Sequence, residues 1–283
     1  MTSTDTGIES VPPLVVLRPS HGWRSLKLGE LWSYRELLYF LTWRDVLIRY
    51  KQAVLGVAWA VLQPFLTMIV FTLVFSGLMN VSSGDTPYAL FSLAALVPWQ
   101  LFAGGLNKSG ATLVANANLL TKVYFPRLIM PTSAVLAGLV DFAIGMVLLA
   151  GMMVYFGVTP TWNVLWLPLL VVLTLLTALS VSLWLSALNV MYRDVQYVIP
   201  LVVQLWMFVS PVIYSTGTVP AGPMRIVYGL NPMAGVIQGF RWALLGEAPP
   251  SGLLLIGAGV VIVVFVGGLF FFKRVERTFA DVV

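Results

Sequence analysis

Six long apolar stretches most strongly restrict how this chain of 283 residues can fold. They lie at 53–79, 88–106, 128–157, 164–190, 198–214 and 252–272. A bilayer core of about 30 Å is crossed by around 20 helical residues, each rising about 1.5 Å. The pattern therefore predicts an all-α integral membrane protein with six transmembrane helices. The fifth stretch is the shortest, and it contains Pro200 and Pro211.

The composition agrees with a lipid environment. Apolar residues make up 59% of the chain and charged residues only 10%, against roughly 45–50% and about 25% in soluble domains. So few charges cannot cover a water-exposed surface. The absence of cysteine excludes disulfides and thiolate metal sites.

Most Lys and Arg residues are predicted on one side of the membrane. Fourteen of the 16 precede the first span, follow the second or fourth, or lie in the tail, whereas Arg225 and Arg241 lie opposite. The positive-inside rule then places both termini in the cytoplasm. This distribution also explains the net charge of +5 without nucleic acid as a partner.

Two segments are expected before the first span. Residues 1–29 are polar and rich in proline, lack the apolar core of a signal peptide, and read as a flexible cytoplasmic arm. In residues 30–51, Trp32, Tyr39, Trp43 and Tyr50 fall on one helical face. Tyr and Trp favour the headgroup region, so we expect an interfacial helix on the cytoplasmic leaflet. The alternative is a soluble helix whose aromatic side chains pack on a partner.

The segment 215–251, between the fifth and sixth spans, is rich in Pro and Gly and yet apolar. Such a sequence is unusual for a free extracellular loop. We expect it to return into the outer leaflet as short re-entrant helices, which membranes allow where protein covers the broken backbone. The membrane domain would then comprise 30–283, with spans over 53–272 and a cytoplasmic tail at 273–283.

The sequence offers few parts for an enzyme. The single histidine, His21, lies in the arm, and Asn107-Lys108-Ser109 lacks the glycines of a phosphate-binding loop. We therefore expect no catalytic residue, no metal site and no cofactor bound by this chain.

Asp141 is the one ionisable residue well inside a span, without an evident basic partner. It reads as a proton-relay residue or as a hydrogen-bonded structural carboxyl.

Several aromatic residues near span ends are candidates to stack on sugar rings along a substrate channel, although most such residues pack or face lipid. The candidates are Trp59, Phe65, Trp99, Phe102, Trp206, Phe208 and Tyr214.

Two polar segments at the predicted cytoplasmic face suit docking to a partner, namely 116–127 and Tyr192-Arg193-Asp194-Val195. Their candidate contact residues are Asn118, Lys122, Tyr124, Phe125, Arg127, Arg193 and Asp194.

Four short motifs, in this order, resemble ABC-2 type exporter permeases of the branch that exports O-antigen, capsule and teichoic-acid polysaccharides. The first is Arg49 to Gly56 with Trp59 and Gln63-Pro64, and the second is Tyr192 to Val195. The third is Ser210-Pro211-Val212-Ile213-Tyr214, and the fourth is Leu230-Asn231-Pro232 with Phe240-Arg241. The resemblance covers residues 30–283 and leaves out the arm.

The resemblance implies a homodimer with the translocation path between two six-helix subunits in the bacterial inner membrane. Two copies of a separate cytoplasmic ATPase, which binds ATP and Mg, would dock on the segment 116–127. The substrate would be a glycan on a polyprenyl pyrophosphate lipid. Arg44, Arg49 and Lys51 are then candidates to meet that pyrophosphate at the cytoplasmic leaflet.

Three other functions are weighed against this one. An ABC-2 permease for drugs or small lipids would share the fold. A membrane transferase acting on polyprenyl lipids needs clustered acids at one membrane face, which this sequence lacks. A secondary transporter would favour inverted repeats and several buried charges, and neither is found.

Overall fold

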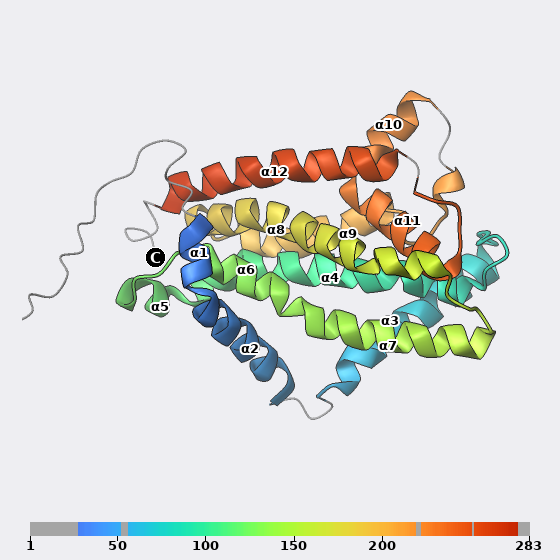
Figure 1. Ribbon diagram of the computed structural model, residues 1–283, viewed down its shortest axis with the longest axis horizontal. Helices are drawn as coiled ribbons and strands as arrows, with labels where there is room; N and C mark the ends of the chain where they lie inside the picture. Colours follow the sequence, from blue (N-terminus) through green and yellow to red (C-terminus); the bar gives the residue numbers. More distant parts are fainter. Residues whose placement is uncertain (1–27, 52–55, 219–221, 251, 277–283) are drawn as a thin grey trace, which may run out of the picture.

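The computed structural model describes residues 28–51, 56–218, 222–250 and 252–276. In these residues every regular element is helical, and no strand is present. The arm with His21, residues 52–55 of the first motif, and most of the tail lie outside the described residues. The helices form an elongated bundle, with α2 crossing it obliquely near one end (Figure 1).

Five helical units are long and apolar enough to cross a membrane. They are α3 (Ala58–Phe71), continued by a π-helix at Thr72–Leu78; α4 (Tyr88–Ala115); α6 (Ile129–Leu136) with α7 (Gly138–Phe156); a 3-10 turn at Trp162–Trp166 with α8 (Leu167–Met191); and α12 (Leu253–Glu276). The protein is therefore a multi-pass membrane protein, as the apolar stretches predict.

The predicted fifth span is shorter than expected. Helix α9 covers Val195–Val209, so 15 residues are helical, and the chain leaves the helix at Ser210. Pro211 explains the stop, because it has no N–H for the helix ladder and disfavours the helical conformation in the residue before it. The boundary predicted at 214 is thus wrong, and residues 210–214 form a non-helical segment.

Helix α4 is the centre of the bundle. It packs on α3, α6, α7, α8, α9 and α11 (Pro232–Leu245), and Figure 1 shows it running through the middle. In its most apolar window 78% of the residues are buried, against 17% to 28% in the other four spans. The protein core therefore surrounds α4, and the other spans turn much of their apolar surface outward.

The N-terminal helix differs in detail from the one predicted over 30–51. It is divided into α1 (Leu28–Ser33) and α2 (Arg35–Lys51), which packs on α6. Trp32, Tyr39 and Trp43 are exposed, as an interfacial aromatic face requires. Tyr50 departs from that face, because its hydroxyl turns toward Asp141 of α7.

The segment 215–251 contains two helices, α10 (Pro223–Gly229) and the almost wholly buried α11. They lie at the opposite end of the bundle from α5 (Ala117–Lys122) (Figure 1). Helix α11 approaches α12 closely at Gly235, where an added Cβ would lie 2.7 Å from the Leu254 Cα. A glycine is therefore required at this crossing, and the buried helix agrees with the predicted re-entrant fold.

Candidate functional site

Four polar side chains from three helices meet at the first turn of α7, and we call them the charged cluster: Arg49, Tyr50, Lys108 and Asp141. Asp141 Oδ2 forms ion pairs with Arg49 Nη1 and with Lys108 Nζ, the latter at 3.5 Å. The Tyr50 hydroxyl donates a hydrogen bond to Asp141 Oδ1. The cluster therefore ties α2 and α4 to α7.

The prediction that Asp141 lacks a basic partner is wrong. The apolar stretch ends at residue 106, which predicts a loop at Lys108, whereas α4 continues as one helix to Ala115 and carries Lys108 within it. Arg49 belongs to the interfacial helix predicted over 30–51, and α2 brings this residue against α7. Neither contact could be predicted from hydropathy, because hydropathy locates the spans but does not show which helices pack together.

The charged cluster is partly open and carries excess positive charge. The side chains of Arg49, Lys108 and Asp141 are 33%, 30% and 29% exposed. Ion pairs this exposed stabilise a fold by only about 0–1 kcal/mol. Two cations share one carboxylate, so the cluster is suited to attracting a further anion.

The three residues predicted to meet a lipid pyrophosphate do not form one site. The guanidinium of Arg44 donates to Asp45 Oδ1 at 2.9 Å and 3.1 Å. Arg44 and Lys51 line a shallow apolar depression on α2 together with Phe40, Trp43, Leu47 and Ile48. Arg49 belongs instead to the charged cluster, where Lys108 is the second cation.

The aromatic channel candidates fall into two groups. Trp99 and Phe102 are buried, and the Phe102 ring packs on Trp206 with centroids 5.1 Å apart. Trp99 and Phe102 are therefore core residues of the subunit, which argues against direct contact with a substrate. Trp59 on α3 and Phe208 on α9 are about half exposed, while Phe65 and Tyr214 are partly buried.

Arg241 of α11 holds the non-helical segment after α9. Its side chain is only 1% exposed and lies over the Phe91 ring. Nε donates to the Phe91 carbonyl at 3.2 Å, Nη1 to the Tyr214 carbonyl at 3.3 Å, and Nη2 to the Val212 carbonyl at 3.0 Å. Backbone carbonyls thus compensate the charge of this buried cation. The sequence places Arg241 on the side opposite to most Lys and Arg residues, and it does not predict this structural role.

Asn231 joins the same region from the other direction. Its Oδ1 caps α11 by accepting from the Met233 N–H at 3.1 Å, and it also accepts from Trp206 Nε1 at 3.0 Å. Its Nδ2 donates to Ser210 Oγ at 2.9 Å. The third and fourth motifs of the sequence therefore meet in space at the end of α9.

The predicted docking segment 116–127 is partly anchored and partly exposed. Phe125 is buried in a hydrophobic cluster with Leu41, and Arg127 Nη1 donates to the Glu276 carbonyl at 2.5 Å. Lys122 and Tyr124 are exposed, the latter by 80%. The anchored residues position a surface that projects from the end of the bundle.

The remaining docking candidates are also at the surface. Asn118 is exposed on α5, and Arg193 and Asp194 are exposed in the turn between α8 and α9. That turn is supported by the buried Asn189, whose Nδ2 donates to the Gly110 carbonyl at 3.0 Å and whose Oδ1 accepts from the Gln196 N–H at 3.1 Å. A lone Asn in an apolar helix was the available sequence signal for this residue.

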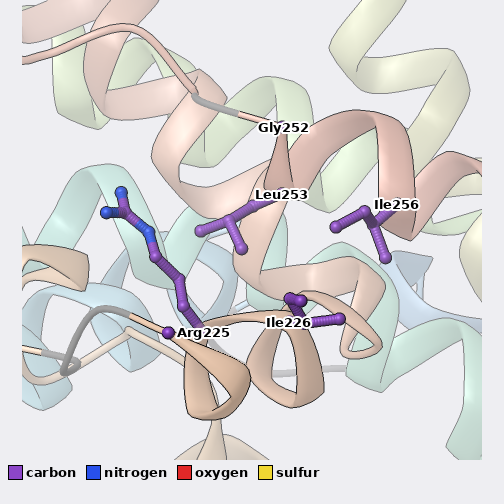
Figure 2. Close-up of a pocket in the computed structure, with 6 residues that line it drawn as sticks. Arg225, Ile226, Gly252, Leu253 and Ile256 are labelled. Carbon is purple, nitrogen blue, oxygen red and sulfur yellow. The ribbon is translucent and has the colours of Figure 1, made fainter.

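A small crevice lies at the other end of the molecule, where α10 meets the first turns of α12 (Figure 2). Its volume is about 280 Å³, and its walls are apolar apart from Arg225. Ile226, Leu253 and Ile256 line it with Gly222 and Gly252. Among the described residues, no group of His, Cys, Asp and Glu is placed to hold a metal ion.

Comparison with known proteins identifies the family. Residues 36–245 match the family described as ABC-2 type transporter. The chain is 30% identical over 251 residues to the O-antigen export system permease protein RfbA of Myxococcus xanthus, covering 88% of this chain and 96% of that protein. A Klebsiella pneumoniae protein of the same name is 27% identical, with 87% and 95% covered.

A further relative is the polysialic acid transport protein KpsM of Escherichia coli, 23% identical over 241 residues, which cover 82% of this chain and 91% of KpsM. These alignments run through nearly the whole of each relative. On these matches, the chain belongs to the ABC-2 type transporter family.

Proposed function

We propose that this protein is the membrane-spanning permease subunit of an ATP-driven exporter that moves a lipid-linked polysaccharide, of the O-antigen or capsular kind, out of the bacterial cytoplasm. The observation that carries the proposal is the similarity over nearly full length to permeases named for O-antigen export and to a polysialic acid transport protein. A drug exporter of the same fold would not be expected to resemble both kinds.

The energy for export would come from a partner. The sequence lacks a phosphate-binding loop, so ATP and Mg are assigned to two copies of a separate cytoplasmic ATPase. The exposed Lys122 and Tyr124, held by the buried Phe125, form the surface proposed to receive it. The exposed turn at Arg193 and Asp194 is the second proposed contact.

The orientation proposed is that of both termini in the cytoplasm of the inner membrane. The contact between Arg127 and the Glu276 carbonyl supports it, because two segments predicted as cytoplasmic lie at one end of the bundle. Helices α10 and α11 lie at the other end (Figure 1), as a segment at the outer leaflet should.

The translocation path is proposed to lie between two copies of the chain. Helices α3 and α9 support this arrangement, because both turn large apolar side chains outward. Among the channel candidates, Trp59 and Phe208 are the exposed ones on these helices, so we retain them, together with the partly buried Phe65 of α3.

Deletion of the gene, followed by fractionation of lipid-linked glycans, tests the function. The mutant should accumulate polyprenyl-linked glycan on the cytoplasmic side and lose surface glycan, and the intact gene on a plasmid should restore it. Normal surface glycan in the deletion strain would overturn the proposal. Glycan absent from both compartments would indicate a transferase or another biosynthetic enzyme instead.

A further inference from the structure

An apolar groove lies between α3 and α7. It has a volume of about 560 Å³ and is lined by Val57 and Val61 of α3 and by Ile144, Val147, Leu148, Gly151 and Met152 of α7. We call it the α3–α7 groove. Apolar walls favour a hydrocarbon chain over a polar group, because a polar group buried there would lack hydrogen-bond partners.

Along α7, the charged cluster comes one turn before the first lining residue of this groove. Asp141 precedes Ile144 by three residues and Leu148 by seven, a spacing that places all three on one helical face. From Asp141 to Met152 α7 rises about 16 Å. The lining residues of the groove are all apolar, and the charged side chain that precedes them on α7 is Asp141, which is paired with Arg49 and Lys108.

We propose that the α3–α7 groove binds the polyprenyl chain of the lipid-linked substrate, and that Arg49 and Lys108 bind its diphosphate in place of the Asp141 carboxylate. This inference rests on the proposed function and specifies where that substrate is held. In the absence of substrate, Asp141 serves as an internal anion that keeps both cations oriented.

Charge and shape favour this lipid as the occupant. The cluster has two cations for one carboxylate, and a diphosphate carries more negative charge than the carboxylate that it would replace. A guanidinium matches phosphate oxygens with paired hydrogen bonds. One groove with one charged end matches a lipid with a single chain, whereas a phospholipid has two chains and a single phosphate.

Photolabelling of the purified permease–ATPase complex in lipid nanodiscs tests the groove. The probe is a polyprenyl diphosphate with a diazirine in its chain, and labelled peptides are mapped by mass spectrometry. Labels on α3 and α7 are expected. Labels confined to other helices would overturn the proposal.

Two glycines provide a matched pair of variants. Gly151 lines the groove and Gly259 lies on α12, both are exposed, and a Cβ added at either would meet no atom within 4 Å. Gly151→Leu should fill the groove and lower labelling severalfold, while Gly259→Leu should not. Equal labelling of the two variants would contradict a chain bound in the groove.

The head of the site is tested with charge variants. Arg49→Gln and Lys108→Gln should each weaken probe binding about tenfold, since each removes a charged hydrogen-bond donor to the diphosphate. Asp141→Asn should strengthen binding, because it removes the competing anion. Lys273→Gln is the control, since Lys273 is also ion-paired, to Glu276 at 2.7 Å, but lies on α12.

Weaker binding by an Asp141→Asn complex that still elutes as an intact assembly would overturn the role assigned to Asp141.

A phospholipid carrying the same diazirine provides the second comparison. If it labels the groove and polyprenyl diphosphate does not compete, the groove holds ordinary membrane lipid and the proposal fails.

Probe binding is measured without transport, so the two proposals fail separately. Normal surface glycan in the deletion strain together with groove labelling would overturn the exported substrate and leave the lipid site. Trapped glycan together with labelling elsewhere would overturn the lipid site alone.

Discussion

The guanidinium of Arg241 donates a hydrogen bond of 3.0 Å to the backbone carbonyl of Val212, 29 positions earlier in the chain. Val212 lies in the non-helical segment that Pro211 creates, where carbonyls have no partner in a helix ladder. Unpaired carbonyls inside a membrane protein are costly. Arg241 therefore makes it possible for the chain to leave α9 and return through α11.

Replacing this residue should destabilise the protein severely. Arg241→Met removes the donors to the Val212 and Tyr214 carbonyls, which lie outside any helix, whereas the Phe91 carbonyl remains within α4. Each carbonyl left unpaired costs about 1–3 kcal/mol, so a loss of about 2–6 kcal/mol is expected. Thermal unfolding in detergent, followed by tryptophan fluorescence, measures the effect. Arg225→Met, at the exposed arginine of α10, is the control, and an equal loss in both variants would contradict the role given to Arg241.

Asn231 and Trp206 should act as a coupled pair. Asn231→Ala removes the cap of α11, worth about 0.5–2 kcal/mol, and also leaves the indole N–H of Trp206 without its acceptor. Trp206→Phe removes that N–H and keeps the aromatic ring. The double variant should therefore lose less stability than the sum of the single variants, and strictly additive losses would show that the hydrogen bond contributes nothing.

The spans could be predicted from the sequence because lipid imposes one requirement on all of them. About 20 apolar residues satisfy a bilayer wherever they occur, so the apolar stretches found α3, α4, α7, α8 and α12. The same reasoning overestimated the length of α9. The apolar sequence continues to Tyr214, whereas the helix stops before Pro211. The segment 215–251 was predictable from a different pattern. It is apolar, as a membrane segment should be, but it contains too many Pro and Gly residues to form one continuous helix.

The sites were less predictable because they depend on which helices become neighbours. Asp141 was recognised as unusual, but its partners Arg49 and Lys108 are 92 and 33 positions earlier in the chain. Both were explained as interfacial or loop cations, which satisfied the positive-inside rule without requiring a partner. Likewise, nothing in the local sequence of Trp99 or Phe102 shows that α4 is the buried centre of the subunit.

Glu247 should make the stability depend on pH. Within the described residues its Oε1 is buried and without a hydrogen-bond partner. Burial raises the pKa of this carboxyl above its ordinary value of 4.5, and the nearby Arg241 opposes the shift only in part. The folded state then holds the proton more tightly than the unfolded state does, so this contribution is present below pH 4.5 and is lost as pH rises through the raised pKa.

Unfolding midpoints measured from pH 4 upward test this sign. Glu247→Gln should remove the decline that the wild type shows above pH 4.5, since the amide cannot ionise. Asp85→Asn, at an exposed carboxyl before α4, controls for the loss of one negative charge. A decline that persists unchanged in Glu247→Gln would assign the pH dependence to other groups.

Tyr124 should be a principal contact for the ATPase. Its ring is 80% exposed, yet the neighbouring Phe125 is buried and fixes the segment to the bundle. Large aromatic side chains at interface centres commonly contribute about 2 kcal/mol or more. Tyr124→Ala should therefore weaken co-purification of the ATPase about tenfold or more and reduce glycan export, while the permease remains folded.

Tyr155 provides a matched control for this prediction, because it is also 80% exposed but lies near the end of α7, at the opposite end of the α6–α7 unit from segment 116–127. Tyr155→Ala should leave ATPase binding unchanged. Phe125→Ala should differ from both, since a buried Phe replaced by Ala costs about 3–5 kcal/mol of stability and would lower the amount of folded permease. If Tyr124→Ala binds the ATPase as tightly as Tyr155→Ala does, the exposed part of segment 116–127 is not the docking surface.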